Sequence, residues 1–180
     1  MDMQQQIITH LEQLAVKGPQ AVEAIVQTSA TPDVIVGIPV EGYGVSLNLA
    51  DYDRYSVILR HLEISDNSFV VDDSQVKDFL HQAATTIAQR LTYLEEPLAL
   101  IELDAYNSVA QLRSSPPLST PTEITYWELN LWSAPHPHAR VARYRWTAKD
   151  CERTSLNHPS TFVAVGRLVQ DLAASLAAIR

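Results

Sequence analysis

The feature that most constrains this chain is a tryptophan-rich stretch at residues 122–146, TEITYWELNLWSAPHPHARVARYRW. It contains all 3 tryptophans of the sequence. Two runs of alternating β-forming residues flank a turn with prolines, which is the pattern of a β-hairpin. A fold that accommodates this stretch needs an antiparallel sheet with one buried face.

The charges of the hairpin predict how its strands pair. In the predicted register the buried face sets Trp127 opposite Trp146, Leu129 opposite Tyr144, and Leu131 opposite Ala142. The polar face sets Glu128 opposite Arg145, Asn130 opposite Arg143, and Trp132 opposite Val141. A shift by one residue would bring both arginines to the face of Trp127, which a half-buried sheet disfavours.

The second face of this hairpin is the candidate binding surface. It carries large aromatic and charged side chains on the side away from Trp127: Tyr126, Glu128, Asn130, Trp132, Arg143 and Arg145. Aromatic side chains on the second face of a sheet are covered either by a helix of the same chain or by a partner. The sequence leaves both alternatives open.

Hydrophobic periodicity predicts the remaining elements. Helical spacing occurs at residues 4–16, 21–26, 76–94 and 159–179, the first two forming two short helices or one helix broken at Gly18 and Pro19. Asp73 or Ser74 is the expected N-cap of the central helix, which Pro97 ends. Strand patterns occur at residues 34–40, 45–49, 54–64 and 98–103, with turns at residues 41–44 and 51–53.

Several details of these elements follow from single residues. Thr31 and Pro32 open the first strand, and Pro39 places that strand at a sheet edge because proline lacks a backbone donor. Val40 is expected opposite Val45. Residues 98–103 are nearly all apolar, as in a central strand. Residues 105–113 form either a turn or a further strand, and the proline-rich residues 114–121 form a loop.

These elements predict one α+β domain over residues 1–180. Its antiparallel sheet has five to six strands, and the order of elements is α-βββ-α-ββ(β)-α with N-terminal, central and C-terminal helices. This order resembles the fold of type III secretion chaperones and related small α+β proteins. The resemblance covers most of the chain in element order and includes no sequence motif. It implies a non-enzymatic, often dimeric module that binds a protein or peptide.

Composition narrows the classes of partner. Residues 1–104 contain 16 acidic and 5 basic side chains, and residues 105–180 contain 5 acidic and 8 basic ones. This acidic balance argues against nucleic acid as a partner. The start of the chain shows no secretory signal, no apolar run reaches the length of a membrane span, and the 1 cysteine excludes an internal disulfide. We therefore expect a cytoplasmic protein.

Candidate catalytic groups are present but lack a recognised arrangement. His136, His138, Cys151 and His158 match no standard zinc spacing, and Cys151 lies between two acids that suppress its thiolate. No glycine-rich phosphate loop occurs. We expect no metal and no cofactor. We expect a non-catalytic protein- or peptide-binding module, for which a homodimer is one possible state. The alternative is a small-molecule-binding protein or enzyme with a cavity between sheet and helices, where Glu102, Asp104 and Arg143 are the polar candidates.

Overall fold

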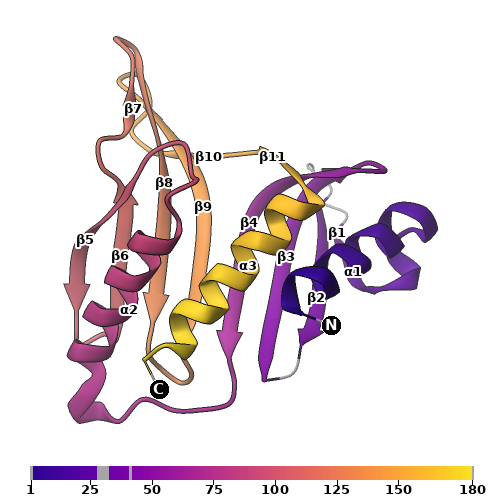
Figure 1. The fold of residues 1–180 in the computed structure, drawn as a ribbon. Helices are drawn as coiled ribbons and strands as arrows, with labels where there is room; N and C mark the ends of the chain where they lie inside the picture. The colour runs from indigo at the N-terminus through magenta and orange to yellow at the C-terminus, as the bar shows by residue number, and fades with distance from the viewer. Residues whose placement is uncertain (1, 28–32, 41, 180) are drawn as a thin grey trace.

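The computed structural model of the chain describes residues 2–27, 33–40 and 42–179 (Figure 1). Its helices are α1 (Met3–Lys17), α2 (Val76–Arg90) and α3 (Phe162–Ala177), with short 3-10 turns η1 (Pro19–Ala21) and η2 (Asp73–Gln75). The first group of strands is β1 (Glu23–Gln27), β2 (Asp33–Val40), β3 (Tyr43–Tyr52) and β4 (Ser56–Asp66). The second group is β5 (Leu98–Asp104), β6 (Val109–Ser114), β7 (Leu118–Ser119), β8 (Glu123–Trp132), β9 (His138–Thr147), β10 (Thr154–Leu156) and β11 (His158–Thr161).

All described strands belong to one antiparallel sheet with the order β1-β2-β3-β4-β9-β8-β6-β5. The helices lie side by side on one face of this sheet, and α3 runs diagonally across its middle (Figure 1). The predicted α+β class and the layout of helices and sheet are therefore confirmed. The sheet has 11 strands, more than the predicted five to six.

The two halves of the sheet meet at β4 and β9 and then diverge. These strands pair directly only where residues 61–65 of β4 face residues 138–142 of β9. Beyond this contact β10 pairs with β9, and β11 pairs with the first part of β4. The short strands thus fill the wedge between the halves. This arrangement brings His158 and Ser160 of β11 beneath the start of α3.

The core lies between the sheet and the three helices. Alternate residues of each strand point into it, because a strand exposes successive side chains to opposite faces. Leu47, Leu62, Leu129 and Val141 supply the centre of the sheet, and each is fully buried. Thr161 caps α3 by accepting a hydrogen bond from the N–H of Ala164 at 3.2 Å. The apolar stripe of α3 then packs against β4, α1 and α2.

The second predicted helix, at residues 21–26, is wrong. After Gly18 and Pro19 the chain makes η1 and then the edge strand β1, which pairs with β2. Val22, Ile25 and Val26 are β-branched residues that suit a strand better than a helix. The predicted edge position of β2 is consequently also wrong. Pro39 is tolerated because β1 begins at Glu23, opposite Gly37, so along the described chain the backbone of Pro39 has no partner strand on that side.

Three further boundaries differ from the prediction. Helix α2 ends at Arg90 rather than Leu94, and Asp72, not Asp73 or Ser74, is the acid that caps the turn before it. Pro159 lies in β11, and α3 begins only at Phe162. The expected opening residues Thr31 and Pro32, and Glu41 of the expected turn, lie outside the described residues.

The predicted central strand at residues 98–103 is an edge strand. β5 ends the sheet and pairs only with β6 along the described chain, and Ile101 at its bulge is 54% exposed. Its apolar run reflects contact with α2 on one face rather than burial on both. Residues 105–108 form a turn that leads into β6, and the proline-rich loop contains the short strand β7.

The predicted register of the tryptophan hairpin is wrong by three residues. Trp127 stands opposite Arg143, and Ile124 stands opposite Trp146. Because the shift is odd, Tyr144 and Trp146 move to the face away from the helices, where Trp146 is 40% exposed. The predicted burial of Trp127, Leu129 and Leu131 is confirmed. The β2–β3 register is shifted by two, which keeps the predicted faces: Ile38, not Val40, stands opposite Val45.

Candidate functional site

The open face of the sheet, on the side away from the helices, carries four of the six predicted binding residues. Tyr126, Glu128, Asn130 and Trp132 alternate along β8 with the buried residues of the core. The Glu128 side chain is fully buried in this face, because the guanidinium of Arg113 lies 2.9 Å from its Oε2 and Arg153 binds the same oxygen. The Nδ2 of Asn130 donates to Glu128 Oε1 at 3.2 Å.

Aromatic rings complete this open-face network. The Arg113 guanidinium lies 5.4 Å from the ring centre of Tyr126, and that of Arg153 lies 4.1 Å from the ring centre of Tyr144. Trp132 stacks on His138 with ring centres 4.7 Å apart. No helix of the described chain covers this face. The predicted residues are nevertheless engaged with one another, so the face is an ordered polar surface rather than an apolar docking patch.

Arg143 and Arg145 lie on the helix face, in contrast to the prediction. Arg143 donates to Glu96 Oε1 at 2.8 Å and to Glu95 Oε2 at 3.2 Å. Arg145 makes only a loose contact with Glu123, at 3.9 Å. A charged residue is tolerated on the helix face at position 143 because two carboxylates of the α2–β5 loop neutralise it.

The polar residues of the predicted enzyme-like alternative are not brought together. Glu102 stands opposite Gln111 at the exposed edge of the sheet. Asp104 accepts hydrogen bonds from the backbone and side chain of Asn107, which holds the β5–β6 turn. Arg143 lies on the other face of the sheet, so these three residues do not form one site.

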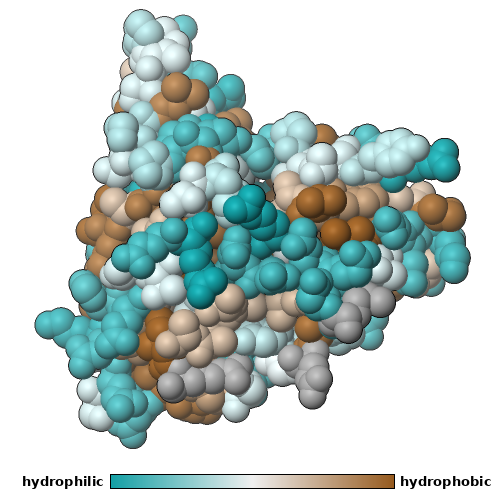
Figure 2. All heavy atoms as spheres, viewed as in Figure 1, coloured by the Kyte–Doolittle hydropathy of each residue, from teal (hydrophilic) through white to brown (hydrophobic). Residues whose placement is uncertain are grey.

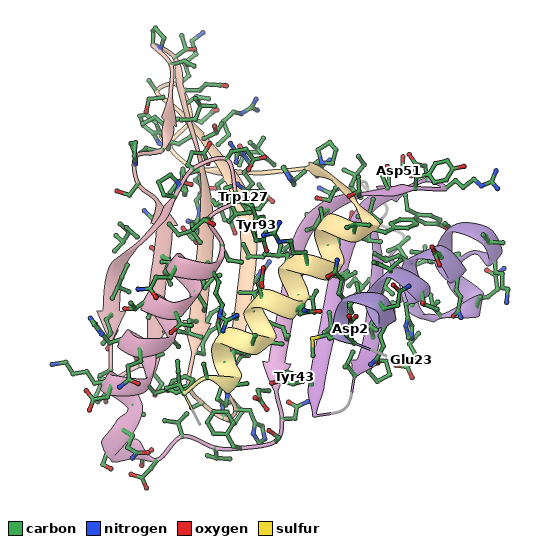
Figure 3. The ribbon with its side chains drawn as sticks, viewed as in Figure 1. Asp2, Glu23, Tyr43, Asp51, Tyr93 and Trp127 are labelled. Carbon is green, nitrogen blue, oxygen red and sulfur yellow. The ribbon has the colours of Figure 1, made fainter. Side chains whose placement is uncertain are left out.

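A small cleft between the sheet and α3 gathers a different set of polar groups. Two of its lining residues, Tyr93 and Trp127, are labelled in Figure 3. Its volume is about 110 Å³. Its lining comes from β4, the α2–β5 loop, β8, β11 and α3: Leu59, Tyr93, Leu94, Glu95, Trp127, His158, Ser160, Ala164, Val165 and Leu168. Sequence reasoning missed this cleft, because Glu95 and His158 are separated in the chain and neither belongs to a motif.

Hydrogen bonds fix the carboxylate at the mouth of this cleft. The indole Nε1 of Trp127 donates to Glu95 Oε2 at 2.6 Å, and Arg143 shares that oxygen. Glu96, behind it, accepts from the hydroxyl of Ser114 at 3.1 Å, and the backbone N–H of Trp127 donates to the same hydroxyl at 2.7 Å. The two carboxylates, the guanidinium and the indole therefore form one closed network.

The electrostatics of the cleft set the charge states of Glu95 and His158. Burial tends to raise the pKa of Glu95, but the hydrogen bond from Trp127 and nearby positive charge outweigh it and leave the pKa below its ordinary value of 4.5. Burial lowers the pKa of His158 below its ordinary 6.5, although Glu95, with Oε1 3.8 Å from Nε2, opposes this. At neutral pH the cleft thus contains a carboxylate beside a neutral imidazole.

An apolar groove lies between α1, the β3–β4 turn and the start of α3. Three large apolar side chains from these three segments line it: Val16 is 75% exposed, Tyr55 71% and Val163 57%. The groove has a volume of about 450 Å³. Figure 2 shows a hydrophobic patch where the first turn of α3 approaches α1.

Local structure holds the walls of this groove in place. Asp53 Oδ1 accepts the backbone N–H groups of Tyr55 and Ser56, each at 2.7 Å, which fixes the turn that presents the Tyr55 ring. The cap at Thr161 fixes the first turn of α3, which presents Val163. Val16 lies off the buried stripe of α1. No sequence pattern connects the three residues, so the groove could not be predicted.

The remaining candidate groups have structural partners or are solvent-exposed. His136 Nδ1 lies 3.0 Å from the carbonyl of Phe69, and His138 Nδ1 lies 2.8 Å from the carbonyl of His136. Cys151 is exposed. Among the described residues no three histidine, cysteine or acidic side chains gather in a way that could hold a metal ion.

Comparison of the chain with protein-family models, with curated proteins and with solved structures finds no match. Within residues 2–27, 33–40 and 42–179, no helix has the length and apolar character needed to cross a membrane. The function is therefore inferred from the geometry of the groove, the cleft and the open sheet face.

Proposed function

We propose that this chain is a non-catalytic protein-binding module that docks an apolar segment of a partner protein in the groove between α1, the β3–β4 turn and α3. The observation that carries the proposal is the convergence of Val16, Tyr55 and Val163, three largely exposed apolar side chains from separate segments, on one groove. Clustered exposed apolar side chains mark interaction sites more often than single ones do.

The burial gained on docking supports this role. Transfer of apolar surface from water stabilises a complex by roughly 25 cal/mol per Å². Val16, Tyr55 and Val163 expose most of their surface in the free chain, so a partner that covers them gains this term without reorganising the core. Anchoring of an apolar helix face in a groove is a common mode of peptide recognition.

The charges around the groove favour a basic partner. Glu12 lines the groove, Asp51 lies near the end of β3, where Figure 3 labels it, and Asp53 lies in the β3–β4 turn. Hydrogen bonds from Tyr55 and Ser56 lower the pKa of Asp53, so it stays ionised. Arg54 is the single basic residue in the groove lining. The expected occupant is an amphipathic segment whose apolar residues are flanked by lysine or arginine.

Selection from a displayed library of random 16-residue peptides tests the proposal. We expect the enriched peptides to combine apolar residues at helical spacing with lysine or arginine. Replacing Val16, Tyr55 and Val163 together by serine should weaken binding of a selected peptide at least about tenfold. Tyrosine is enriched among the residues that contribute most of an interface's affinity, and the two valines add apolar surface that the partner covers. A direct titration by fluorescence anisotropy measures the change.

The matched control is Ile101→Ser, which removes a comparably exposed apolar side chain from β5 on a distant part of the sheet. It should leave the affinity unchanged. Equal binding by the triple-serine variant would place the site elsewhere and overturn the proposal. A wild-type dimer that the triple-serine variant lacks, measured by light scattering, would assign the groove to a second copy of the chain and also contradict a separate partner.

A further inference from the structure

We propose that the cleft formed by Glu95, Trp127, His158 and Ser160 binds a primary alkylammonium group. This cleft and the apolar groove lie on either side of the β11–α3 junction, because Ser160 and Ala164 line the cleft whereas Thr161 and Val163 line the groove. The inference does not depend on the function proposed for the groove.

The charges at the cleft leave one negative charge to be matched. Glu95 and Glu96 carry two negative charges, and Arg143, which contacts both, supplies one positive charge. The neighbouring Arg167 and Asp171 of α3 lie 3.7 Å apart and balance each other. Since His158 is neutral, the excess is a single negative charge. A ligand group with one positive charge restores the balance.

The hydrogen-bonding groups of the cleft are acceptors with unused capacity. Glu95 Oε2 accepts from Trp127 and Arg143, whereas Oε1 lies 3.8 Å from Nε2 of His158. The backbone N–H of Glu95 also donates to its own carboxylate, but a carboxylate has about four acceptor positions, so capacity remains. Within the described chain the hydroxyl of Ser160 has no hydrogen-bond partner. The ring of His158 packs nearly perpendicular to that of Trp127, and its Nε2 lies 3.8 Å from Glu95 Oε1, beyond hydrogen-bond distance. An ammonium group has three donors and no acceptor, which suits a carboxylate, a hydroxyl and a neutral imidazole.

The size and walls of the cleft restrict the rest of the ligand. A volume of about 110 Å³ equals the share of three or four water molecules at about 30 Å³ each. It admits an ammonium group and a few methylene groups but not a nucleotide or a similar cofactor. Leu59, Val165 and Leu168 form apolar walls that would surround such methylene groups.

The ammonium group has two chemical sources, a small free amine or the side chain of a lysine in another protein. Nuclear magnetic resonance of the full chain distinguishes them. The indole N–H of Trp127, assigned by comparison with Trp127→Phe, reports directly on Glu95, its acceptor. The probes are n-butylammonium chloride and Nα-acetyl-lysine methylamide, with n-butanol and Nα-acetyl-norleucine methylamide as their uncharged counterparts.

We expect both ammonium probes to shift the Trp127 signal in a saturable way and the uncharged counterparts to leave it unchanged. Tighter binding of the free amine identifies a small molecule as the source, and tighter binding of the lysine derivative identifies a protein side chain. Glu95→Gln should weaken binding at least about tenfold, because it removes the charge from the principal acceptor. Ser160→Ala should weaken it severalfold through loss of one hydrogen bond.

Glu102→Gln is the matched control, since it removes one negative charge from an exposed site on β5 and should leave the affinity unchanged. Glu95 is half-exposed, so the glutamine variant should fold, and circular dichroism checks this. A Trp127 shift that potassium chloride reproduces at equal ionic strength would overturn the proposal. An unchanged affinity in both Glu95→Gln and Ser160→Ala would overturn it as well, whatever peptide binding at the groove shows.

Discussion

Replacing Arg143 by alanine should strongly lower the free energy of unfolding, because it removes one partner of a buried ion pair. The Arg143 side chain is 11% exposed, and its two Nη atoms lie 2.8 and 3.2 Å from the carboxylate of Glu96. Glu96 itself is 8% exposed, so the variant leaves a buried carboxylate whose one remaining hydrogen-bond partner within the described chain is the Ser114 hydroxyl. Removing one member of a buried ion pair costs about 3–5 kcal/mol.

Arg145 provides a control on the same strand with the same substitution. Its side chain is 43% exposed and lies 3.9 Å from that of Glu123, which is 39% exposed. Exposed pairs of this kind contribute about 0–1 kcal/mol, so Arg145→Ala should cost less than about 1 kcal/mol. The register predicted from sequence reverses this order, because it places Arg143 opposite Asn130 in solvent and Arg145 opposite Glu128.

Urea unfolding followed by tryptophan fluorescence measures both free energies of unfolding, provided that the slope with denaturant stays the same in the variants. A double variant with Glu96→Gln should lose less than the sum of the two single changes, since it leaves no unpaired charge buried. If Arg143→Ala costs less than about 1 kcal/mol, or less than Arg145→Ala, then the ion-pair network and the hairpin register described above are both refuted.

Two further substitutions test the packing of the helices and the protonation of the cleft. Gly166→Ala would place a methyl group 2.9 Å from the Gln4 carbonyl oxygen of α1. We expect the free energy of unfolding to fall by about 1–2 kcal/mol and amide exchange in α1 to become faster. Gly37→Ala, where the nearest contact is 3.8 Å, should unfold like the wild type. Because burial lowers the folded-state pKa of His158, the stability that it contributes is fully present above the unfolded pKa of 6.5 and is lost as the pH falls through the folded value. His158→Gln should therefore make the unfolding free energy fall less steeply below pH 6.5 than it does in the wild type. His61, whose pKa is also lowered by burial, contributes equally in the variant and the wild type. An identical decline in the two proteins would contradict the buried neutral state of His158.

The α+β class was predictable because periodicity is a local property. The stripes of α1, α2 and α3 and the alternation of β2, β3 and β8 are each visible within about ten residues of sequence. The missed strands lack such a signal. β10 and β11 are 3 and 4 residues long and exist because β4 and β9 diverge, leaving a wedge that the chain fills. β5 looked central because apolar composition does not distinguish contact with a helix from burial on both faces.

The candidate surfaces show the same limit. Tyr126, Glu128, Asn130 and Trp132 share a face because they alternate along one strand, which the sequence shows directly. Arg153, which binds Glu128 and covers Tyr144, comes from the loop after β9 and has no signal of its own. The groove and the cleft each combine segments that are far apart in the chain. Their residues could be identified only after the sheet had brought those segments together.

The hairpin register shows why charge alternation was a poor guide in this sheet. In β9, Arg140 lies on one face of the strand, while Arg143 and Arg145 lie on the other together with Val141. Either register therefore places at least one arginine on the face of the core, and pairing within the hairpin cannot decide between them. The decision comes from Glu95 and Glu96, 48 and 47 residues earlier in the chain, which neutralise Arg143 so that Val141 can be fully buried. A charged residue on an apolar face is thus evidence against a register only when no distant counter-charge can reach it.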